Sequence, residues 1–238
     1  MTNMFTVALI GPDGAGKSTI GHKLEKISPL PAKYIYMGVN LESSNMVLPT
    51  TRLWLEVKRA RGRRPDMATT PLKTRPVEKS KMGLKRQLVT SLKGSLRLIS
   101  LTVEEWFRQM VVWSYNLRGY LVILDRHFYF DYFAHDIANP DPNRPLTSRI
   151  HGYMLKKLYP KPDFVIFLDA PAEVLYARKP EGTLESRESR RQEYIQMRDW
   201  VKNYAIVDVS QPEEESTREV CELIMNFYSS RRGLGKVV

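Results

Sequence analysis

The chain has 238 residues, 42% hydrophobic and 26% charged, which is the composition of an ordinary globular protein with a substantial core. Its single cysteine, Cys221, excludes an intramolecular disulfide framework, and no stretch approaches the roughly 20 apolar residues of a membrane-spanning helix. The chain enters its first apolar run at once, without a signal peptide, so we expect a cytoplasmic protein.

The net charge of +11 resides in one segment. Between positions 49 and 97 there are 14 lysines and arginines and three acidic residues, so the rest of the chain is neutral overall. This part also contains prolines and few core residues, which indicates an irregular structure. We expect residues 39–95 to form a basic, partly irregular insertion after the second strand, helical near 51–61, within a single domain that spans 1–238.

Five short apolar runs predict strands, and helical patterns separate them. The runs cover 5–10, 33–37, 120–125, 163–169 and 205–209. Helices are expected after the first strand and over 96–119, 146–159 and 213–229. The alternation predicts an α/β fold with a five-stranded, mostly parallel sheet and helices on both faces. Ligands bind such sheets beyond the carboxyl ends of the strands.

The predicted helix at 96–119 carries an apolar stripe at helical spacing. We expect this stripe to pack in the core or to contact another subunit. Its members are Leu96, Ile99, Val103, Trp106, Met110, Trp113 and Leu117.

The turn after the first strand carries the clearest motif. Residues 11–19, GPDGAGKST, match the G-x-x-x-x-G-K-[ST] pattern of a phosphate-binding loop, or P-loop, between a strand and a helix. The glycines let the backbone N–H groups approach a phosphate and form an anion-binding nest. Lys17 supplies positive charge to the β- and γ-phosphates, and Ser18 offers its hydroxyl to Mg²⁺. The motif predicts a P-loop NTPase fold and assigns to ATP the residues Gly11, Asp13, Gly14, Ala15, Gly16, Lys17, Ser18 and Thr19.

A second polar pair ends the third predicted strand. In VILDR, at 122–126, Asp125 follows a buried run, where a carboxylate would hold Mg²⁺ or its water shell beside Ser18. Arg126 comes next, and its planar guanidinium matches the geometry of an acceptor phosphate. Both residues are candidates for catalysis.

A charged segment at 178–191 is the third feature, and we expect it to act as a lid. Position 14 is glycine, so the P-loop itself offers no arginine to the transferred phosphoryl group. A lid arginine would stabilise the charge on that group. Arg187, Arg190 and Arg191 share a helix face, and we select Arg187 as the catalytic candidate.

Three segments in this order resemble the thymidylate kinase family of P-loop nucleoside monophosphate kinases. They are GPDGAGKST at 11–19, LDRHFYFD at 124–131 and LDAPAEVLYARK at 168–179. The resemblance implies that the chain uses ATP and Mg²⁺, that Asp13 contacts the acceptor's sugar, and that Arg126 binds the acceptor phosphate. It also implies that Arg178 lies near the ATP base, and that the chain forms a homodimer.

The resemblance fails where the family recognises thymine. The family's R-E-P-G-G-T after the second strand is replaced by MGVNLESS, and its S-x-x-A-Y-Q by FYFDYFAHD. The chain is closer to the branch found with polysaccharide biosynthesis genes. A nucleoside monophosphate such as dTMP is therefore one expected acceptor, and a sugar phosphate or a lipid-linked intermediate is another.

A third hypothesis concerns the basic segment rather than the acceptor. Residues 49–97 would bind nucleic acid or an anionic membrane, with ATP hydrolysis as a switch. The segment contains one aromatic residue, Trp54, which weakens a model of stacking on single strands. A solvated basic arm is the simpler interpretation.

Overall fold

A computed structural model describes residues 4–40, 44–60, 84–139 and 141–233. Its centre is a five-stranded parallel sheet with the strand order β2-β3-β1-β4-β5. The strands are β1 (Thr6–Ile10), β2 (Ala32–Tyr36), β3 (Leu121–Asp125), β4 (Phe164–Asp169) and β5 (Tyr204–Asp208). Each pairing is parallel, so the expectation of a mostly parallel five-stranded sheet is confirmed.

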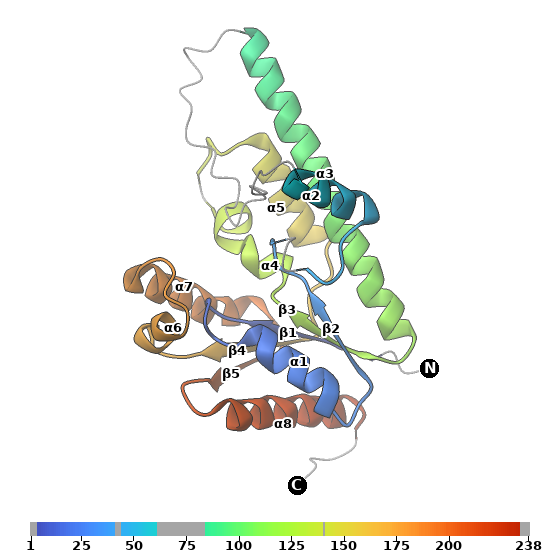
Figure 1. Cartoon of the computed structure of the whole chain (residues 1–238), viewed down its shortest axis with the longest axis vertical. Coiled ribbons are helices and arrows are strands. Elements are labelled where there is room, and N and C mark those ends of the chain that lie inside the picture. Colours follow the sequence, from blue (N-terminus) through green and yellow to red (C-terminus); the bar gives the residue numbers. More distant parts are fainter. Residues whose placement is uncertain (1–3, 41–43, 61–83, 140, 234–238) are drawn as a thin grey trace.

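Helices cover both faces of the sheet (Figure 1). They are α1 (Lys17–Ile27), α2 (Pro49–Ala60), α3 (Leu84–Leu117), α4 (Phe128–Asp131), α5 (Leu146–Lys157), α6 (Ala172–Arg178), α7 (Leu184–Gln196) and α8 (Glu213–Arg231). A π-helical turn, Phe133–Ile137, follows α4, and a 3₁₀ turn, Met197–Trp200, follows α7. None of the helices in the described ranges offers an apolar stretch sufficient to cross a bilayer.

Alternate strand residues build two cores, because successive side chains of a strand point to opposite faces. Val7 and Leu9 of β1 pack with α1 and α8, whereas Ala8 and Ile10 pack with residues of α3, α4 and α5. The strands are buried on both sides, as expected of a parallel sheet covered by helices. This arrangement fixes the carboxyl ends of β1, β3 and β4 at one edge.

Helix α3 begins at Leu84, twelve positions before the expected start at Leu96. The prediction ended the irregular insertion at residue 95 because that segment is basic and has few core residues, but the helix already includes residues 84–95. Part of the predicted irregular insertion is therefore helical, as is Pro49–Ala60. Residues 61–83, the remainder of its basic core, lie outside the described residues.

The apolar stripe of α3 does not face the core, so that half of the expectation is wrong. Leu96, Val103 and Met110 are each more than half exposed. The inner face of the helix instead combines the buried Val112 with two charged residues, Glu105 and Arg108, that are completely buried. Figure 1 shows the N-terminal part of α3 extending away from the sheet.

A buried hydrogen-bond network connects the inner face of α3 to its neighbours, although Oε1 of Glu105 and Nε of Arg108 have no partner among the described residues. His151 of α5 lies between two carboxylates, 2.7 Å from Asp136 through Nδ1 and 3.2 Å from Glu105 through Nε2. The Tyr159 hydroxyl donates to Glu105 at 2.7 Å, and Arg108 donates to the Gly38 carbonyl oxygen at 2.8 Å. The network joins α3 to α5 and to the turn after β2.

Candidate active site

The P-loop connects the carboxyl end of β1 to the start of α1. Gly16 precedes the helix in a left-handed conformation with φ of 79°, and no side chain caps the first turn. That turn also contains no acidic residue. The free backbone N–H groups and the helix dipole therefore remain available to an anion.

Gly14 explains why the P-loop carries no arginine. Its φ is +92°, and a Cβ atom there would lie 2.5 Å from the backbone oxygen of Leu175 in α6. A side chain at this position would require both a strained backbone and movement of α6. An arginine for the transferred phosphoryl group must therefore come from elsewhere in the fold.

Lys17 lies beneath the loop with only 5% of its surface exposed. Its Nζ donates to the carbonyl oxygens of Gly11 and Pro12 at 2.8 and 2.7 Å. Burial and the nearby Arg126 guanidinium lower the pKa of Lys17 to about 7. A phosphate at the loop would favour the charged form and raise this pKa again.

Asp125, at the end of β3, lies beside the first turn of α1. Its Oδ2 accepts hydrogen bonds from the Ser18 hydroxyl at 2.5 Å and from the Tyr34 hydroxyl at 2.7 Å. Its Oδ1 is buried and has no hydrogen-bond partner among the residues that the structure describes. One unpartnered carboxylate oxygen next to a serine hydroxyl fits a Mg²⁺ ion or its water shell, because Mg²⁺ prefers oxygen ligands.

The residues of α1 make room for Tyr34. A Cβ atom on Gly21 would lie 2.7 Å from the Tyr34 ring, and the His22 ring packs on it with 3.9 Å between centroids. The ring is thereby held with its hydroxyl toward Asp125. Tyr34 carries no signal in the sequence, because no motif includes it.

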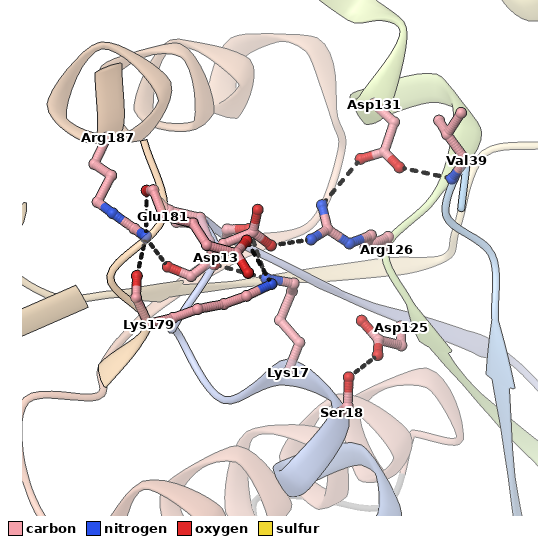
Figure 2. A network of polar contacts seen from close by, with 12 residues as sticks. Asp13, Lys17, Ser18, Val39, Asp125, Arg126, Asp131, Lys179, Glu181 and Arg187 are labelled. Carbon is pink, nitrogen blue, oxygen red and sulfur yellow. Dashed lines mark hydrogen bonds and ion pairs between the residues drawn. The ribbon is translucent and has the colours of Figure 1, made fainter. Parts of the chain in front are cut away.

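Arg126 follows Asp125 with φ of 66°, the one positive value outside glycine among the described residues. Strained backbone of this kind clusters at functional sites. Its guanidinium hydrogen-bonds to the Asp13 carboxylate and lies 3.9 Å from Asp131 (Figure 2). Burial alone would lower the pKa of Arg126, but Asp131 and Asp13 raise it, so the guanidinium stays charged.

These groups border a pocket of about 500 Å³. The P-loop supplies one side of it, including Asp13, Lys17, Ser18 and Thr19. The remaining lining residues come from the ends of β2 and β3, from α4 and from the lid: Tyr36, Val39, Asn40, Arg126, Asp131, Lys179, Glu181, Arg190 and Tyr194. The structure therefore brings the P-loop, Arg126 and part of the lid to one cavity.

The arginines of the lid have separate environments. Arg187 is 5% exposed and donates to the backbone carbonyl oxygens of Asp13, Lys179 and Glu181 (Figure 2). Arg191 forms a bidentate pair with Asp169, at 2.6 and 2.9 Å.

Arg190 is the lid arginine that lines the pocket, and its guanidinium lies 5.5 Å from the centre of the Tyr194 ring. Arg178 is exposed at the end of α6 and is absent from the pocket lining. The structure thus places the selected Arg187 against backbone carbonyls, with Arg190 in the cavity.

Several pocket residues were missed from the sequence. Tyr36 and Tyr194 belong to no spacing pattern that marks a ligand site, since each resembles an ordinary core or helix residue in its segment. Asp131 ends the LDRHFYFD segment at 124–131, but no role was assigned to it. Position alone offered a signal for Tyr36 and Asp131. Tyr36 ends β2 as Asp125 ends β3, and Asp131 follows Asp125 at the end of the short helix α4. Arg190 was among the lid candidates but was not selected.

Comparisons with known proteins agree with this architecture. No family model matches the sequence. A probable thymidylate kinase from Archaeoglobus fulgidus is 30% identical over 121 residues, which cover 48% of this chain and 58% of that protein. The match thus spans less than two thirds of that relative.

The solved structure of a thymidylate kinase from Candida albicans matches this fold with a TM-score of 0.58 and 20% identity, over 94% of this chain and 92% of that one. The chain is therefore thymidylate kinase-like: it has the fold of a thymidylate kinase over nearly its whole length and resembles that family in sequence over about half of it.

Proposed function

We propose that the protein is an ATP-dependent phosphotransferase that moves the γ-phosphoryl group of ATP to a phosphate-bearing acceptor, a nucleoside monophosphate such as dTMP. The observation that carries this proposal is the single pocket shared by the P-loop and Arg126. Donor phosphates would lie on the P-loop and the acceptor phosphate against Arg126, with the transferred group between them.

In this reaction an oxygen of the acceptor phosphate attacks the γ-phosphorus, and the bond from that phosphorus to the bridging oxygen of ADP breaks. The protein contributes position and charge rather than covalent chemistry. Lys17 and the P-loop N–H groups bind the β- and γ-phosphates, and Arg126 orients the acceptor. Ser18 and Asp125 would hold Mg²⁺, which would supply positive charge to the ATP phosphates.

The lid would close the pocket and supply an arginine. Arg190 fits this role because it lines the pocket, whereas the Arg187 guanidinium is engaged by three carbonyl groups. We therefore assign Arg190 to the transferred group and Arg187 to holding the lid loop against the P-loop. The second role is one of positioning.

We also propose that two copies of the chain associate through the outer face of α3. Apolar residues there follow alternating steps of four and three, which is the spacing of a coiled-coil seam. We call this set the α3 seam, and it comprises Leu92, Leu96, Ile99, Val103, Trp106, Met110, Trp113 and Leu117. Apart from Trp106, every member is at least 41% exposed, which is unusual for a stripe of this length.

The test of the catalytic proposal is ADP release from ATP·Mg²⁺ across a panel of phosphate acceptors, with Lys17→Ala as the blank. Stimulation by dTMP or another nucleoside monophosphate supports the proposed acceptor class. Stimulation by sugar phosphates alone would keep the phosphotransferase and replace the acceptor. ADP release equal to the blank with every acceptor would overturn the proposal.

A further inference from the structure

The pocket contains a carboxylate that the proposed reaction does not use. Asp131, the last residue of α4, lines the cavity on the opposite side of Arg126 from Asp13 (Figure 2). Its side chain is only 7% exposed. A buried negative charge beside a phosphate-binding arginine repels the acceptor phosphate, so its presence requires a compensating interaction.

The described contacts leave this carboxylate with unused capacity. Asp131 Oδ2 accepts one long hydrogen bond, from the Val39 backbone N–H at 3.3 Å. Its Oδ1 is 3.9 Å from the Arg126 guanidinium, which is an ion pair beyond hydrogen-bond distance. A carboxylate has about four acceptor sites, and a buried one that lacks donors is destabilising.

An ionised carboxylate accepts hydrogen bonds and donates none. A keto oxygen or a second phosphate placed against Asp131 would be repelled by the carboxylate. An alkyl group would displace water from the carboxylate without replacing the lost hydrogen bonds. A hydroxyl, an amino group or a ring N–H would satisfy it. Burial raises the pKa of Asp131 above its ordinary value, and Arg126 and Arg190 offset only part of this rise. The ion pair with Arg126, at 3.9 Å, is the contact that favours the charged, accepting form.

The residues that line the cavity near Asp131 are mostly polar, as a polar ligand requires. The Tyr36 side chain, the Asn40 segment and the Asp13 carboxylate line the cavity near Arg126, and Val39 is the aliphatic residue among them. Two carboxylates therefore flank the guanidinium assigned to the acceptor phosphate.

We propose that Asp131 determines acceptor specificity by selecting phosphomonoesters whose organic part presents a hydroxyl or N–H donor to its carboxylate. The inference rests on the proposed function and names the chemistry that its acceptor must carry. The donor belongs either to a sugar hydroxyl or to a base, and matched acceptors distinguish the two.

The experiment compares kcat/KM at saturating ATP·Mg²⁺ for acceptor pairs that differ by one donor. UMP against dUMP and ribose 5-phosphate against 2-deoxyribose 5-phosphate report on a sugar hydroxyl, and dTMP against N3-methyl-dTMP reports on a ring N–H. A site built to hydrogen-bond a donor rejects the analogue that lacks it, so we expect at least one pair to differ by about 100-fold or more.

Two variants connect the preference to this residue. Asp131→Leu removes both oxygens at similar volume and should reduce the ratio to about threefold or less. Asp131→Asn keeps one accepting oxygen without the charge and should give an intermediate ratio. Asp141→Leu, at an exposed loop aspartate, is the matched control and should keep the ratio of the unchanged protein.

The wild-type ratios test the idea even if the variants do not fold. Ratios below about threefold for every pair, with acceptors still phosphorylated, would overturn this inference and leave the proposed function intact. A large ratio that persists in Asp131→Leu would also overturn it. Absence of turnover above the Lys17→Ala blank with all acceptors would overturn both proposals.

Discussion

The Tyr34 hydroxyl donates a 2.7 Å hydrogen bond to Oδ2 of Asp125, while Oδ1 of the same carboxylate stays buried without a partner in the described part of the chain. The tyrosine therefore fixes the carboxylate with one oxygen free for a cation. Partners that orient a ligating group in this way affect metal affinity by about 10–100-fold. Tyr34→Phe should accordingly weaken binding of Mn²⁺, used as a probe for Mg²⁺, by about 10-fold.

Electron paramagnetic resonance of free Mn²⁺, titrated with protein in the presence of ADP, measures this effect without turnover. Tyr120→Phe is the matched control, because that ring packs on Tyr115 away from the site. Equal Mn²⁺ affinity in Tyr34→Phe and the unchanged protein would show that the hydroxyl does not orient Asp125.

The lack of a side chain at Gly38 leaves room for the Arg126 side chain. A Cβ atom at Gly38 would lie 2.5 Å from Cδ of Arg126 and 2.5 Å from the Tyr36 hydroxyl. Gly38→Ala should displace the guanidinium and raise the acceptor KM by about 10-fold or more, with ATP affinity nearly unchanged, because misplaced reactants lose rate steeply. Steady-state kinetics with each substrate varied in turn separates the two effects.

Gly94→Ala provides the control for this substitution. Its new methyl group would meet its nearest neighbour, a methyl group of Thr147, at 3.8 Å, which is an ordinary contact. A rise in the KM for ATP rather than for the acceptor in Gly38→Ala would contradict the placement of Arg126 on the acceptor side.

Local patterns were sufficient to predict the sheet, the P-loop and the Asp125-Arg126 pair. The strands are short apolar runs, and each motif follows a strand directly, so neighbouring residues carry the information. Helix α3 shows where such reasoning fails. Periodicity revealed an apolar stripe, but most of that stripe is exposed, and the face that carries Glu105 is buried. The tertiary partners His151 and Tyr159 explain how Glu105 is accommodated.

In the lid, too, the sequence did not predict which side chain faces inward. Helical spacing placed Arg187 and Arg190 on one face. Residues three apart on a helix are nevertheless not aligned exactly, so their guanidinium groups can reach different places. Which of them meets the cavity depends on how α7 packs against the P-loop. The sequence contains no local signal for that packing.

Substitutions of Arg187 and Arg190 should affect different properties, lid order in the first case and kcat in the second. Arg187→Ala removes the contacts to three backbone carbonyls and should speed amide hydrogen exchange in residues 179–183 by about 10-fold or more. Arg190→Ala should leave that exchange unchanged and lower kcat by about 1,000-fold, the scale of an arginine that stabilises phosphoryl transfer.

Arg218→Ala, at an exposed position of α8, serves as the control for both measurements. If Arg187→Ala lowered kcat at unchanged exchange, its guanidinium would belong to the catalytic group as first expected. A normal kcat in Arg190→Ala would remove that residue from the proposed mechanism.

The α3 seam offers a direct test of association. Met110 lies in the middle of it and is 54% exposed in the single chain. Met110→Glu would bury a charge in the contact between two copies, so the mass from light scattering should fall from roughly twice 27.6 kDa to 27.6 kDa. Lys26→Glu, at an exposed position of α1, should leave the mass unchanged. A wild-type mass of one chain at micromolar concentration would refute the association.

The buried network under α3 makes stability depend on pH. His151 is fully buried, and burial alone would lower its pKa, but hydrogen bonds to Asp136 and Glu105 raise the pKa to about 9. Because the folded value exceeds the unfolded value of about 6.5, the contribution is complete below pH 6.5 and is lost as the pH rises through 9. The integrated effect is on the order of 3 kcal/mol.

Urea unfolding between pH 6 and pH 10 should show this loss in the wild type and not in His151→Gln. The difference between the two proteins is the informative quantity, because Lys17, with its pKa lowered to about 7, changes stability in the opposite sense over the same range. His22→Gln, at an exposed histidine, is the control and should follow the wild type. Parallel curves for the wild type and His151→Gln would show that the imidazole is neutral between its two carboxylates. Arg108 would then be the cation that balances the buried negative charge at α3.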